Sequence, residues 1–175
     1  GACWDPVGGG GTSPIGATLR ARNQGHGLEC SCAAQKGENR DGKLWWEAAD
    51  EAMDKEFHGA YDIWGGDIDP AAIELAKHNA ELAGVEDCIR FEVADAGKFH
   101  RDSEYGQLVC NPPYGERLLE KQEAEAVYRS FGAALRDLPP KWRVVVLSSH
   151  TEFERCFGRP ADKKRKLYNG MIKCC

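Results

Sequence analysis

The sequence lacks any long hydrophobic stretch, which excludes a membrane-spanning helix. No run approaches the roughly eighteen apolar residues that a helix needs to cross a bilayer, and no signal peptide opens the chain. Its 175 residues, 42% hydrophobic and 29% charged, are typical of one soluble globular domain. Because the chain starts and stops abruptly, we expect residues 1–175 to be one domain of a longer protein.

Metal-ligand spacing is also missing. The sequence contains eight cysteines, at positions 3, 30, 32, 88, 110, 156, 174 and 175, and no two of them form the C-x2-C pair that zinc sites use. The five histidines are scattered without ligand spacing. We therefore predict no metal site. Reduced thiols without a secretion signal indicate a cytoplasmic protein.

An excess of positive charge is absent as well, since the net charge is −5. This argues against a domain that grips nucleic acid strongly by itself. One segment departs from the average, because positions 155–166 carry six basic side chains against one acid, Asp162. The basic residues are Arg155, Arg159, Lys163, Lys164, Arg165 and Lys166. Two interpretations stay open, a solvated charge run or one edge of a phosphate-contacting surface.

Predicted strands and helices alternate along the chain, which indicates an open α/β sheet. Strands are predicted over residues 2–4, 61–67, 89–93, 105–110 and 143–147. Helices are predicted over 13–22, 43–57, 70–82, 118–138 and 151–157, with an inserted loop over 23–42. The apolar residues of the third helix that we expect to face the sheet are Ile73, Leu75, Ala76 and Leu82. Asn169-Gly170 predicts an antiparallel hairpin of residues 164–175, which would give the doubly wound, mostly parallel sheet one reversed edge.

A glycine-rich turn follows the first predicted strand. Residues 7–12 read Val-Gly-Gly-Gly-Gly-Thr, directly after Asp5-Pro6. Glycines let the backbone approach a ligand closely at the mouth of a helix, as at the nucleotide-cofactor entrance of a doubly wound sheet. The turn spells neither the dinucleotide fingerprint G-x-G-x-x-G nor the Gly-Lys-Ser/Thr of a phosphate loop. Because an acid precedes the glycines, a cationic group is favoured over a phosphate.

A second unusual turn, Asn111-Pro112-Pro113-Tyr114, follows the fourth predicted strand. Its two prolines remove N–H donors and fix φ, so the turn presents a carboxamide, backbone carbonyls and an aromatic ring. This acceptor-rich pocket suits a planar ring that carries an exocyclic NH2. A plain strand-ending turn is the alternative, because Asn-Pro commonly starts turns. The motif alone leaves both open.

Four motifs together resemble those of an S-adenosylmethionine-dependent methyltransferase. They are Asp5-Pro6-x-x-Gly9-x-Gly11-Thr12, Asp67-Ile68-Asp69-Pro70, Asp95-Ala96 and Asn111-Pro112-Pro113-Tyr114-Gly115-Glu116-Arg117-Leu118. More narrowly, the chain resembles the catalytic domain of the bacterial ribosomal RNA guanine-N(2) methyltransferases that carry a THUMP domain. Asn-Pro-Pro-Tyr is typical of amine methylation in general, and the Gly-Glu-Arg extension narrows the resemblance to this group. We expect the THUMP domain to lie outside this chain.

The resemblance implies a cofactor site and a catalytic turn. The residues implied to hold S-adenosylmethionine are Asp5, Gly9, Gly11, Thr12, Asp67, Ile68, Asp69 and Asp95. Asp5 would attract the amino-acid end, Asp67 would bind the ribose hydroxyls, and Asp95 would accept from the adenine amine beside Ile68 and Asp69. Asn111 Oδ1 and the Pro112 carbonyl would accept the hydrogens of the target amine. Tyr114 would stack on a base flipped out of RNA.

Other functions stay open at this point. DNA adenine methylation and methylation of a release-factor glutamine both use Asn-Pro-Pro-Tyr. A degenerate or truncated domain could instead bind RNA or a partner without transferring a methyl group. A dehydrogenase is a more distant alternative, since doubly wound sheets also bind nicotinamide cofactors.

Overall fold

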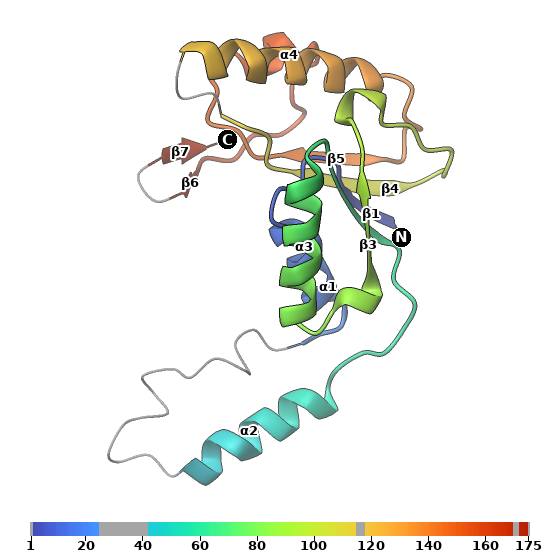
Figure 1. The fold of residues 1–175 in the computed structure, drawn as a ribbon, viewed down its shortest axis with the longest axis vertical. Helices are drawn as coiled ribbons and strands as arrows, with labels where there is room; N and C mark the ends of the chain where they lie inside the picture. Colours follow the sequence, from blue (N-terminus) through green and yellow to red (C-terminus); the bar gives the residue numbers. More distant parts are fainter. Residues whose placement is uncertain (1, 25–41, 115–117, 170–171, 175) are drawn as a thin grey trace.

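The computed structural model describes residues 2–24, 42–114, 118–169 and 172–174. Five parallel strands form one sheet in the order β3-β2-β1-β4-β5, which confirms the predicted α/β class (Figure 1). The strands are β1 (Ala2–Asp5), β2 (Ile63–Asp67), β3 (Ile89–Val93), β4 (Gly106–Cys110) and β5 (Arg143–Val146). The chain proceeds outward from β1 to β3, then crosses to β4 on the other side of β1. In open α/β sheets, ligands bind at such a switch point, beyond the carboxyl ends of the strands.

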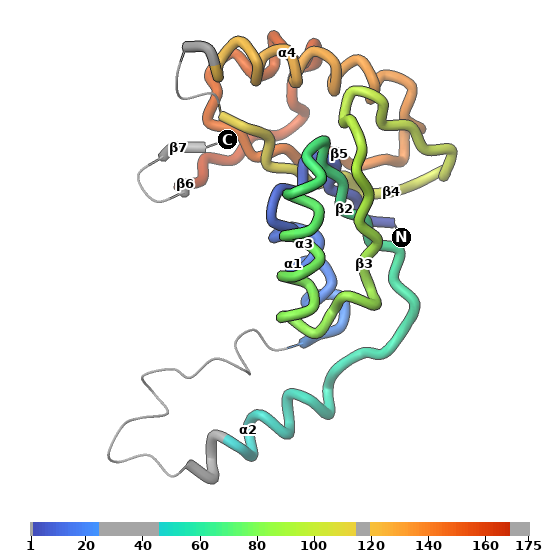
Figure 2. Tube along the Cα trace, in the orientation of Figure 1, coloured from blue at the N-terminus to red at the C-terminus, as the bar shows by residue number. Residues whose placement is uncertain are grey.

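Helices cover both faces of the sheet. The helices are α1 (Thr12–Ala21), α2 (Gly42–Asp54), α3 (Pro70–Leu82), α4 (Leu118–Ala134) and α5 (Phe153–Phe157), with short 3-10 turns η2 (Glu86–Cys88) and η3 (Ala96–Lys98). The path of the chain in Figure 2 shows α1 and α3 together, and α4 on the other side of the sheet. Pro70 begins α3. It lacks an N–H group, but this costs no hydrogen bond, because N–H groups in the first turn of a helix have no partner within the helix. Helix packing therefore leaves the carboxyl edge of the sheet to the loops.

Two apolar layers hold the sheet between its helices. Cys3 and Trp4 are neighbours on β1, and they pack into different layers because successive strand residues point to opposite faces. The layer under α4 contains Trp4, Phe99, Leu108, Phe131, Leu135 and Trp142. The layer under α1 and α3 contains Ile63, Ala80, Val85 and Ile89. β1 is thus clamped at the centre of the fold, and the residues that follow it are held in place.

The predicted reversed edge of the sheet is wrong. The strands β6 (Leu167–Asn169) and β7 (Ile172–Cys174) do pair antiparallel, but they form a separate two-stranded sheet. Among the described residues, β5 pairs only with β4. The twenty residues 147–166 between β5 and β6 include α5, and they carry the chain away from the edge of the sheet. The hairpin signal was local, whereas its placement depends on this long connection.

Two further details of the sequence interpretation change. In α3, Ile73 and Ala76 are buried as expected, but Leu75 and Leu82 are 53% and 64% exposed. The third buried position is Ala80, because a stripe at three-to-four spacing continues from 73 through 76 to 80. Of the predicted inserted loop, positions 25–41 lie outside the described residues. No described helix has the length and apolarity that crossing a membrane requires.

Helix α2 lies apart from the sheet in Figure 1. Its C-terminal end is attached to the end of α1 by backbone contacts, since Phe57 N–H donates to the Arg22 carbonyl at 2.6 Å. The Asn23 amide also donates to the Lys55 carbonyl at 3.1 Å. An ion pair of Arg22 and Glu56, 3.5 Å apart, supports the same junction. α2 is therefore anchored at one end, remote from the carboxyl edge of the sheet.

Candidate functional site

The carboxyl ends of β1, β2 and β4 bring together the two unusual turns of the sequence. β1 pairs in parallel with β2 on one side, where Asp5 lies opposite Gly65. It pairs in parallel with β4 on the other side, where Trp4 lies opposite Leu108. The glycine turn after Asp5 and the turn that begins at Asn111 consequently leave the same edge of the sheet, next to each other. This is the switch point of the strand order.

The glycine turn is tied to the end of β2 by its backbone. Gly8 N–H donates to the Gly66 carbonyl at 2.7 Å, and Gly9 N–H donates to Asp67 Oδ2 at 3.0 Å. Asn79 of α3 donates from Nδ2 to the Gly10 carbonyl at 2.8 Å. The predicted residues Gly9 and Asp67 are therefore in direct contact, although 58 positions separate them in the chain.

Gly11 is required by both its backbone angle and its neighbours. Its φ is 81°, a left-handed conformation that side chains other than glycine rarely adopt. A Cβ there would lie 2.9 Å from the Ala76 Cβ, so the turn packs directly on α3. Gly11 is also the N-cap of α1 and offers no side chain to its first turn, which begins at the exposed Thr12. The N–H groups at the start of α1 therefore face the edge of the sheet without a capping side chain.

Asp5 is a buried acid at the centre of this edge. Asp5 is only 3% exposed, and its Oδ1 accepts a hydrogen bond from the Val7 N–H at 3.2 Å. Burial raises the pKa of Asp5 to about 6, hydrogen bonds from Ser13 and Val7 oppose this, and the charge of Asp67 adds to it. A carboxylate that burial disfavours in its charged form is stabilised when a cation binds beside it. The site can thus supply a negative charge to a cationic ligand.

The remaining predicted acids lie along the same edge with their carboxylates on backbone donors. Asp67 Oδ1 accepts the Asp69 N–H at 3.0 Å, and Asp69 Oδ1 accepts the Ala71 N–H at 2.9 Å as the N-cap of α3. Asp95 Oδ1 accepts the Gly97 N–H at 2.8 Å and caps η3. These bonds leave carboxylate lone pairs for a ligand, because each oxygen can accept more than one hydrogen. Ile68 is 69% exposed between Asp67 and Asp69.

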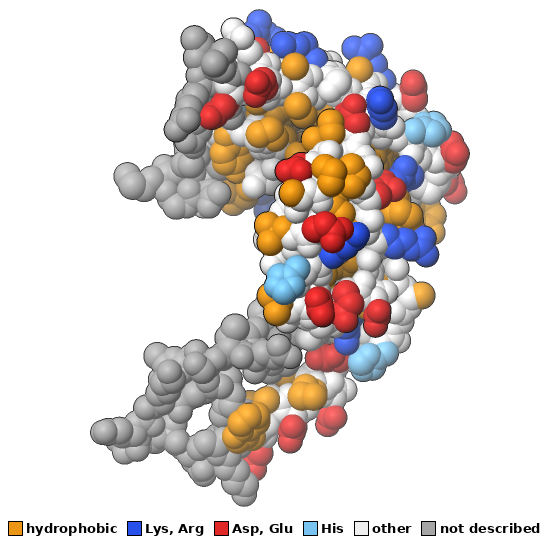
Figure 3. All heavy atoms as spheres, viewed as in Figure 1, with side chains coloured by type: hydrophobic (Ala, Val, Ile, Leu, Met, Phe, Trp, Pro, Cys, Tyr) orange, Lys and Arg blue, Asp and Glu red, His pale blue; other side chains and the backbone are white. Residues whose placement is uncertain are grey.

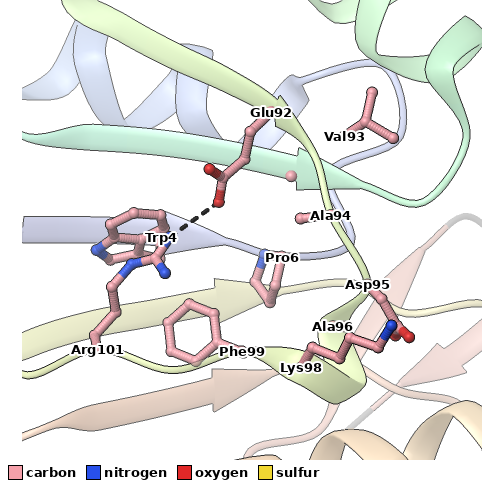
Figure 4. Close-up of a pocket in the computed structure, with 11 residues that line it drawn as sticks. Trp4, Pro6, Glu92, Val93, Ala94, Asp95, Ala96, Lys98, Phe99 and Arg101 are labelled. Atoms are coloured by element: carbon pink, nitrogen blue, oxygen red, sulfur yellow. Dashed lines mark hydrogen bonds and ion pairs between the residues drawn. The ribbon is translucent and has the colours of Figure 1, made fainter.

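A cavity of about 350 Å³ adjoins these residues. Figure 4 shows that its lining includes Asp95 and Ala96, which follow β3, together with Trp4 of β1 and Arg101 of the segment between η3 and β4. Arg101 lies over the Trp4 ring, with 3.6 Å between guanidinium carbon and ring centroid, and pairs with Glu92 at 2.9 Å. The predicted Asp95 therefore lines a concave surface, whereas sequence reasoning missed the arginine and tryptophan beside it.

The turn after β4 is anchored by hydrogen bonds from Leu147 and Tyr128. Leu147 N–H donates to the Cys110 carbonyl at 2.9 Å, so the residue after β5 fixes the point where the turn begins. Pro112 is buried, while Asn111 is exposed and Tyr114 is half-buried. The Tyr128 hydroxyl of α4 donates a short hydrogen bond to the Pro113 carbonyl. This turn therefore exposes its carboxamide while its prolines are anchored. Positions 115–117, which carry the predicted Gly-Glu-Arg extension, lie outside the described residues.

The side chains behind this turn escaped sequence reasoning. Tyr128 is fully buried, and its ring lies edge-on to His150 at 5.4 Å and to Phe153 at 4.8 Å between centroids. Burial is the main cause of the raised pKa of Tyr128, and a side-chain hydrogen bond with Ser148 opposes this shift. His150 Nδ1 accepts the Glu152 N–H at 3.1 Å. In the sequence, Tyr128 fits an ordinary helical core position, so no local signal marks it.

Metal ligation has no visible basis in the described part of the chain. No three His, Cys, Asp or Glu side chains gather there in a way that could hold a metal ion. Cys3, Cys88, Cys110 and Cys156 are free thiols. The chemistry of the edge is therefore that of carboxylates, an amide, backbone donors and a phenol ring.

Comparison with known sequences gives a consistent result. Residues 2–175 match the family model described as RMKL-like, methyltransferase domain. YpsC of Bacillus subtilis (strain 168), a candidate RNA methyltransferase, is 39% identical over 170 residues, which are 97% of this chain and 44% of YpsC. The ribosomal RNA large subunit methyltransferase K/L of Hahella chejuensis (strain KCTC 2396) is 37% identical over 178 residues, 96% of this chain and 24% of that protein. The chain thus spans less than half the length of these relatives.

Solved structures resemble the fold over nearly its whole length. SMU.472, a candidate methyltransferase crystallised with SAH, has a TM-score of 0.92 at 34% identity and covers 99% of this chain and 46% of its own. A predicted N6-adenine-specific DNA methylase from Listeria monocytogenes str. 4b F2365 has a TM-score of 0.92 at 38% identity and covers 99% of this chain and 45% of its own. The chain belongs to the family of RMKL-like methyltransferase domains.

Proposed function

We propose that this methyltransferase domain transfers a methyl group from S-adenosylmethionine to the exocyclic N2 amine of a guanine in 23S ribosomal RNA. One observation carries the proposal: the Asn111–Tyr114 turn and the acid-glycine turn leave adjacent strands at the same edge. The proposed amine acceptor site and the proposed site for a cationic cofactor would then lie side by side. Relatives named as RNA and ribosomal RNA methyltransferases support the choice of RNA.

The edge fits S-adenosylmethionine in charge and shape. The cofactor supplies an electrophilic methyl group on a positively charged sulfur, together with an ammonium, a ribose and an adenine. Asp5 would bind the ammonium end, because a cation there relieves the cost of its burial. Gly9 would leave room for the cofactor, since no atom lies within 4 Å of a Cβ added there, and Gly11 and Thr12 would bring the start of α1 beside it. SAH, the product left after methyl loss, is bound by the similar SMU.472 structure.

The ends of β2 and β3 would hold the nucleoside part. Asp67 is the last residue of β2 and retains lone pairs for the two ribose hydroxyls, in addition to the hydrogen bonds that it already accepts from two N–H groups. Ile68 is exposed where an adenine face could cover it, with Asp69 beside it. Asp95 lines the cavity and can accept a hydrogen from the adenine amine. Each role needs only groups that the edge presents.

The turn after β4 would orient the target amine. The lone pair of an exocyclic amine is conjugated with its ring, so the amine attacks poorly until its hydrogens are drawn aside. Asn111 Oδ1 and the Pro112 carbonyl are the acceptors for those hydrogens. The Pro113 carbonyl is already used by Tyr128, which leaves the Pro112 carbonyl for the substrate. Tyr114 would stack on the flipped-out base, and correct positioning supplies most of the rate.

A methyl-transfer assay tests this function. Labelled S-adenosylmethionine is offered with unmodified 23S ribosomal RNA, with duplex DNA and with a release factor, and the labelled atom is identified after digestion. We expect label on guanine N2 of the RNA alone. Label confined to DNA adenine, an activity suggested by the name of the Listeria structure, would refute the RNA proposal. An absence of transfer to all three, with no cofactor binding by calorimetry, would point to a non-catalytic domain.

Substitution of Asn111 separates catalysis from folding. Asn111→Ala should abolish transfer and leave S-adenosylmethionine affinity nearly unchanged, because the amide contacts only the target amine. Gln107→Ala is the matched control, since Gln107 is exposed near the start of β4, the strand that Asn111 follows. Equal loss of transfer and cofactor affinity in Asn111→Ala would mean that the turn has a structural role.

We also propose that the full-length protein carries a THUMP domain, which the reading frame upstream of this segment would reveal.

A further inference from the structure

The charge of the described surface is uneven. On the face shown in Figure 3, acidic and basic side chains are interspersed. Residues 159–166, called here the basic segment, hold five cations and one acid, and all of them are exposed. Within the described residues, Arg159, Lys163, Arg165 and Lys166 form no ion pair with a carboxylate. Their charges are available to a polyanion.

A single carboxylate fixes the basic segment to α5. Glu154 Oε1 accepts the Ala161 N–H at 2.6 Å. Glu154 Oε2 accepts a short hydrogen bond from Lys164 Nζ. One glutamate thus grips both the backbone and a side chain of the segment. The backbone of the basic segment is therefore fixed relative to α5, and the other cations of the segment extend from this fixed backbone.

The same helix is connected to the candidate catalytic turn. Phe153, the neighbour of Glu154 in α5, packs on Tyr128 with 4.8 Å between ring centroids. Tyr128 in turn donates to the Pro113 carbonyl. Two direct contacts and one step along the chain therefore lead from the turn to Glu154, the anchor of the basic segment. Figure 1 shows β6, which follows the segment, at the end of the sheet where the chain leaves β4.

An exposed aromatic residue ends this surface. Tyr168 on β6 is 71% exposed, directly after the basic segment and Leu167. A tyrosine ring with a free face can stack on an unpaired base, and neighbouring cations can contact the phosphates on either side. An acidic peptide would use the cations but has no base for the ring. A fully paired duplex would hide its base faces from the ring as well.

We infer that the basic segment and Tyr168 bind the single-stranded RNA that flanks the target nucleotide, an inference that rests on the proposed function. Lys163, Arg165 and Lys166 contact phosphates, and Tyr168 stacks on a flanking base. The contacts through Phe153 and Tyr128 fix the position of the bound RNA relative to the Asn111 turn. The surface thus contributes to RNA affinity and takes no part in cofactor binding.

Fluorescence anisotropy with a labelled single-stranded ribosomal RNA oligonucleotide tests the inference, at saturating SAH and over a range of salt. The combined variant Lys163→Gln, Arg165→Gln, Lys166→Gln should lose at least about tenfold in RNA affinity at low salt. Its slope of log affinity against log salt should become shallower by about 2, since each lost phosphate contact removes about 0.7 from the slope. The charge-matched control is Arg20→Gln, Lys77→Gln, Arg136→Gln, on exposed positions of α1, α3 and the residues after α4. The control should keep the wild-type slope.

The stacking contact has its own signature. Tyr168→Ala should weaken binding by about tenfold without changing the salt slope, because it removes a ring and no charge. Tyr168→Phe should restore most of the affinity. In methyl-transfer assays, both the charge variant and Tyr168→Ala should raise KM for RNA while kcat at saturating RNA and the Kd for SAH stay at wild-type values.

The possible failures are distinguishable. A wild-type chain that methylates RNA, with the charge variant and its control equally affected, would overturn the inference and leave the proposed function intact. A wild-type chain that neither binds nor methylates RNA would overturn both. Equal loss of affinity for the RNA and for a polyglutamate peptide, with no effect of Tyr168→Ala, would replace RNA by an acidic protein partner.

Discussion

The buried Asp5 makes a prediction that unites stability with cofactor binding. The raised pKa of about 6, against an ordinary value of 3.8, corresponds to about 3 kcal/mol, at about 1.4 kcal/mol per pH unit. The folded chain holds the proton more tightly than the unfolded chain, so its stability falls as pH rises from about 4 to about 6. Above that range the ligand-free protein carries the whole penalty.

The substitution Asp5→Asn removes the charge and keeps an oxygen for the Val7 N–H. In urea unfolding without cofactor, the variant should match the wild type near pH 4 and exceed its stability by up to about 3 kcal/mol above pH 6. Asp137→Asn, at an exposed position after α4, is the control and should show no such trend. A mutation that stabilises the free protein by this amount would identify Asp5 as a strained functional group.

Cofactor affinity should change in the opposite direction. Calorimetry should show Asp5→Asn binding S-adenosylmethionine more weakly than the wild type at pH 7.5, since the variant offers no charge to the ammonium. Wild-type affinity should decline as pH falls through about 6, because protonation removes the same charge. If Asp5→Asn gains no stability at high pH, or if it binds the cofactor as the wild type does at every pH, the electrostatic role of Asp5 is refuted.

Two further substitutions probe the turns on either side of the site. Tyr128→Phe removes the donor to the Pro113 carbonyl, so urea unfolding should show a loss of about 1 kcal/mol; methyl transfer should slow while S-adenosylmethionine affinity holds, and unchanged kcat would show that the turn needs no anchor. Gly11→Ala meets the Ala76 Cβ at 2.9 Å with φ at 81°, so it should lose both stability and cofactor affinity. Gly10→Ala has its nearest neighbour at 3.4 Å and an ordinary φ, so it should be tolerated; equal damage from both would contradict a specific need at Gly11.

The sheet and the acid-glycine edge could be predicted because their signals are local. A polar residue marks the carboxyl end of an apolar strand, as Asp5 does at the end of β1 and Asn111 does directly after β4, and parallel strands then bring such ends to one edge. The burial of Ile73 and Ala76 also follows from helical spacing. The exposure of Leu75 does not, because it depends on how far around α3 the sheet extends. Three-dimensional packing decides such borderline positions.

Long-range contacts set the limit of sequence reasoning. Tyr128 reaches the Pro113 carbonyl only because the rotation of α4 and the packing of Phe153 point its hydroxyl there. No spacing rule connects a tyrosine in one helix to a carbonyl fifteen residues earlier. The hairpin of β6 and β7 shows the same limit, since its turn is local and its place beside the sheet is not. Both contacts had to be observed.

Charge separation along the molecule gives the two halves of the proposed function a common physical reason. Asp5, Asp67 and Asp95 make the carboxyl edge of the sheet negative, which would suit a sulfonium and an ammonium but repel the phosphates of RNA. An RNA strand would be held by the basic segment, anchored through Glu154, and kept off the acidic edge. Only the uncharged base could then cross to the Asn111 turn. Reversal of charge on the acidic edge should therefore strengthen non-specific RNA binding while it abolishes methyl transfer, whereas loss of the basic segment should weaken RNA binding and spare the cofactor.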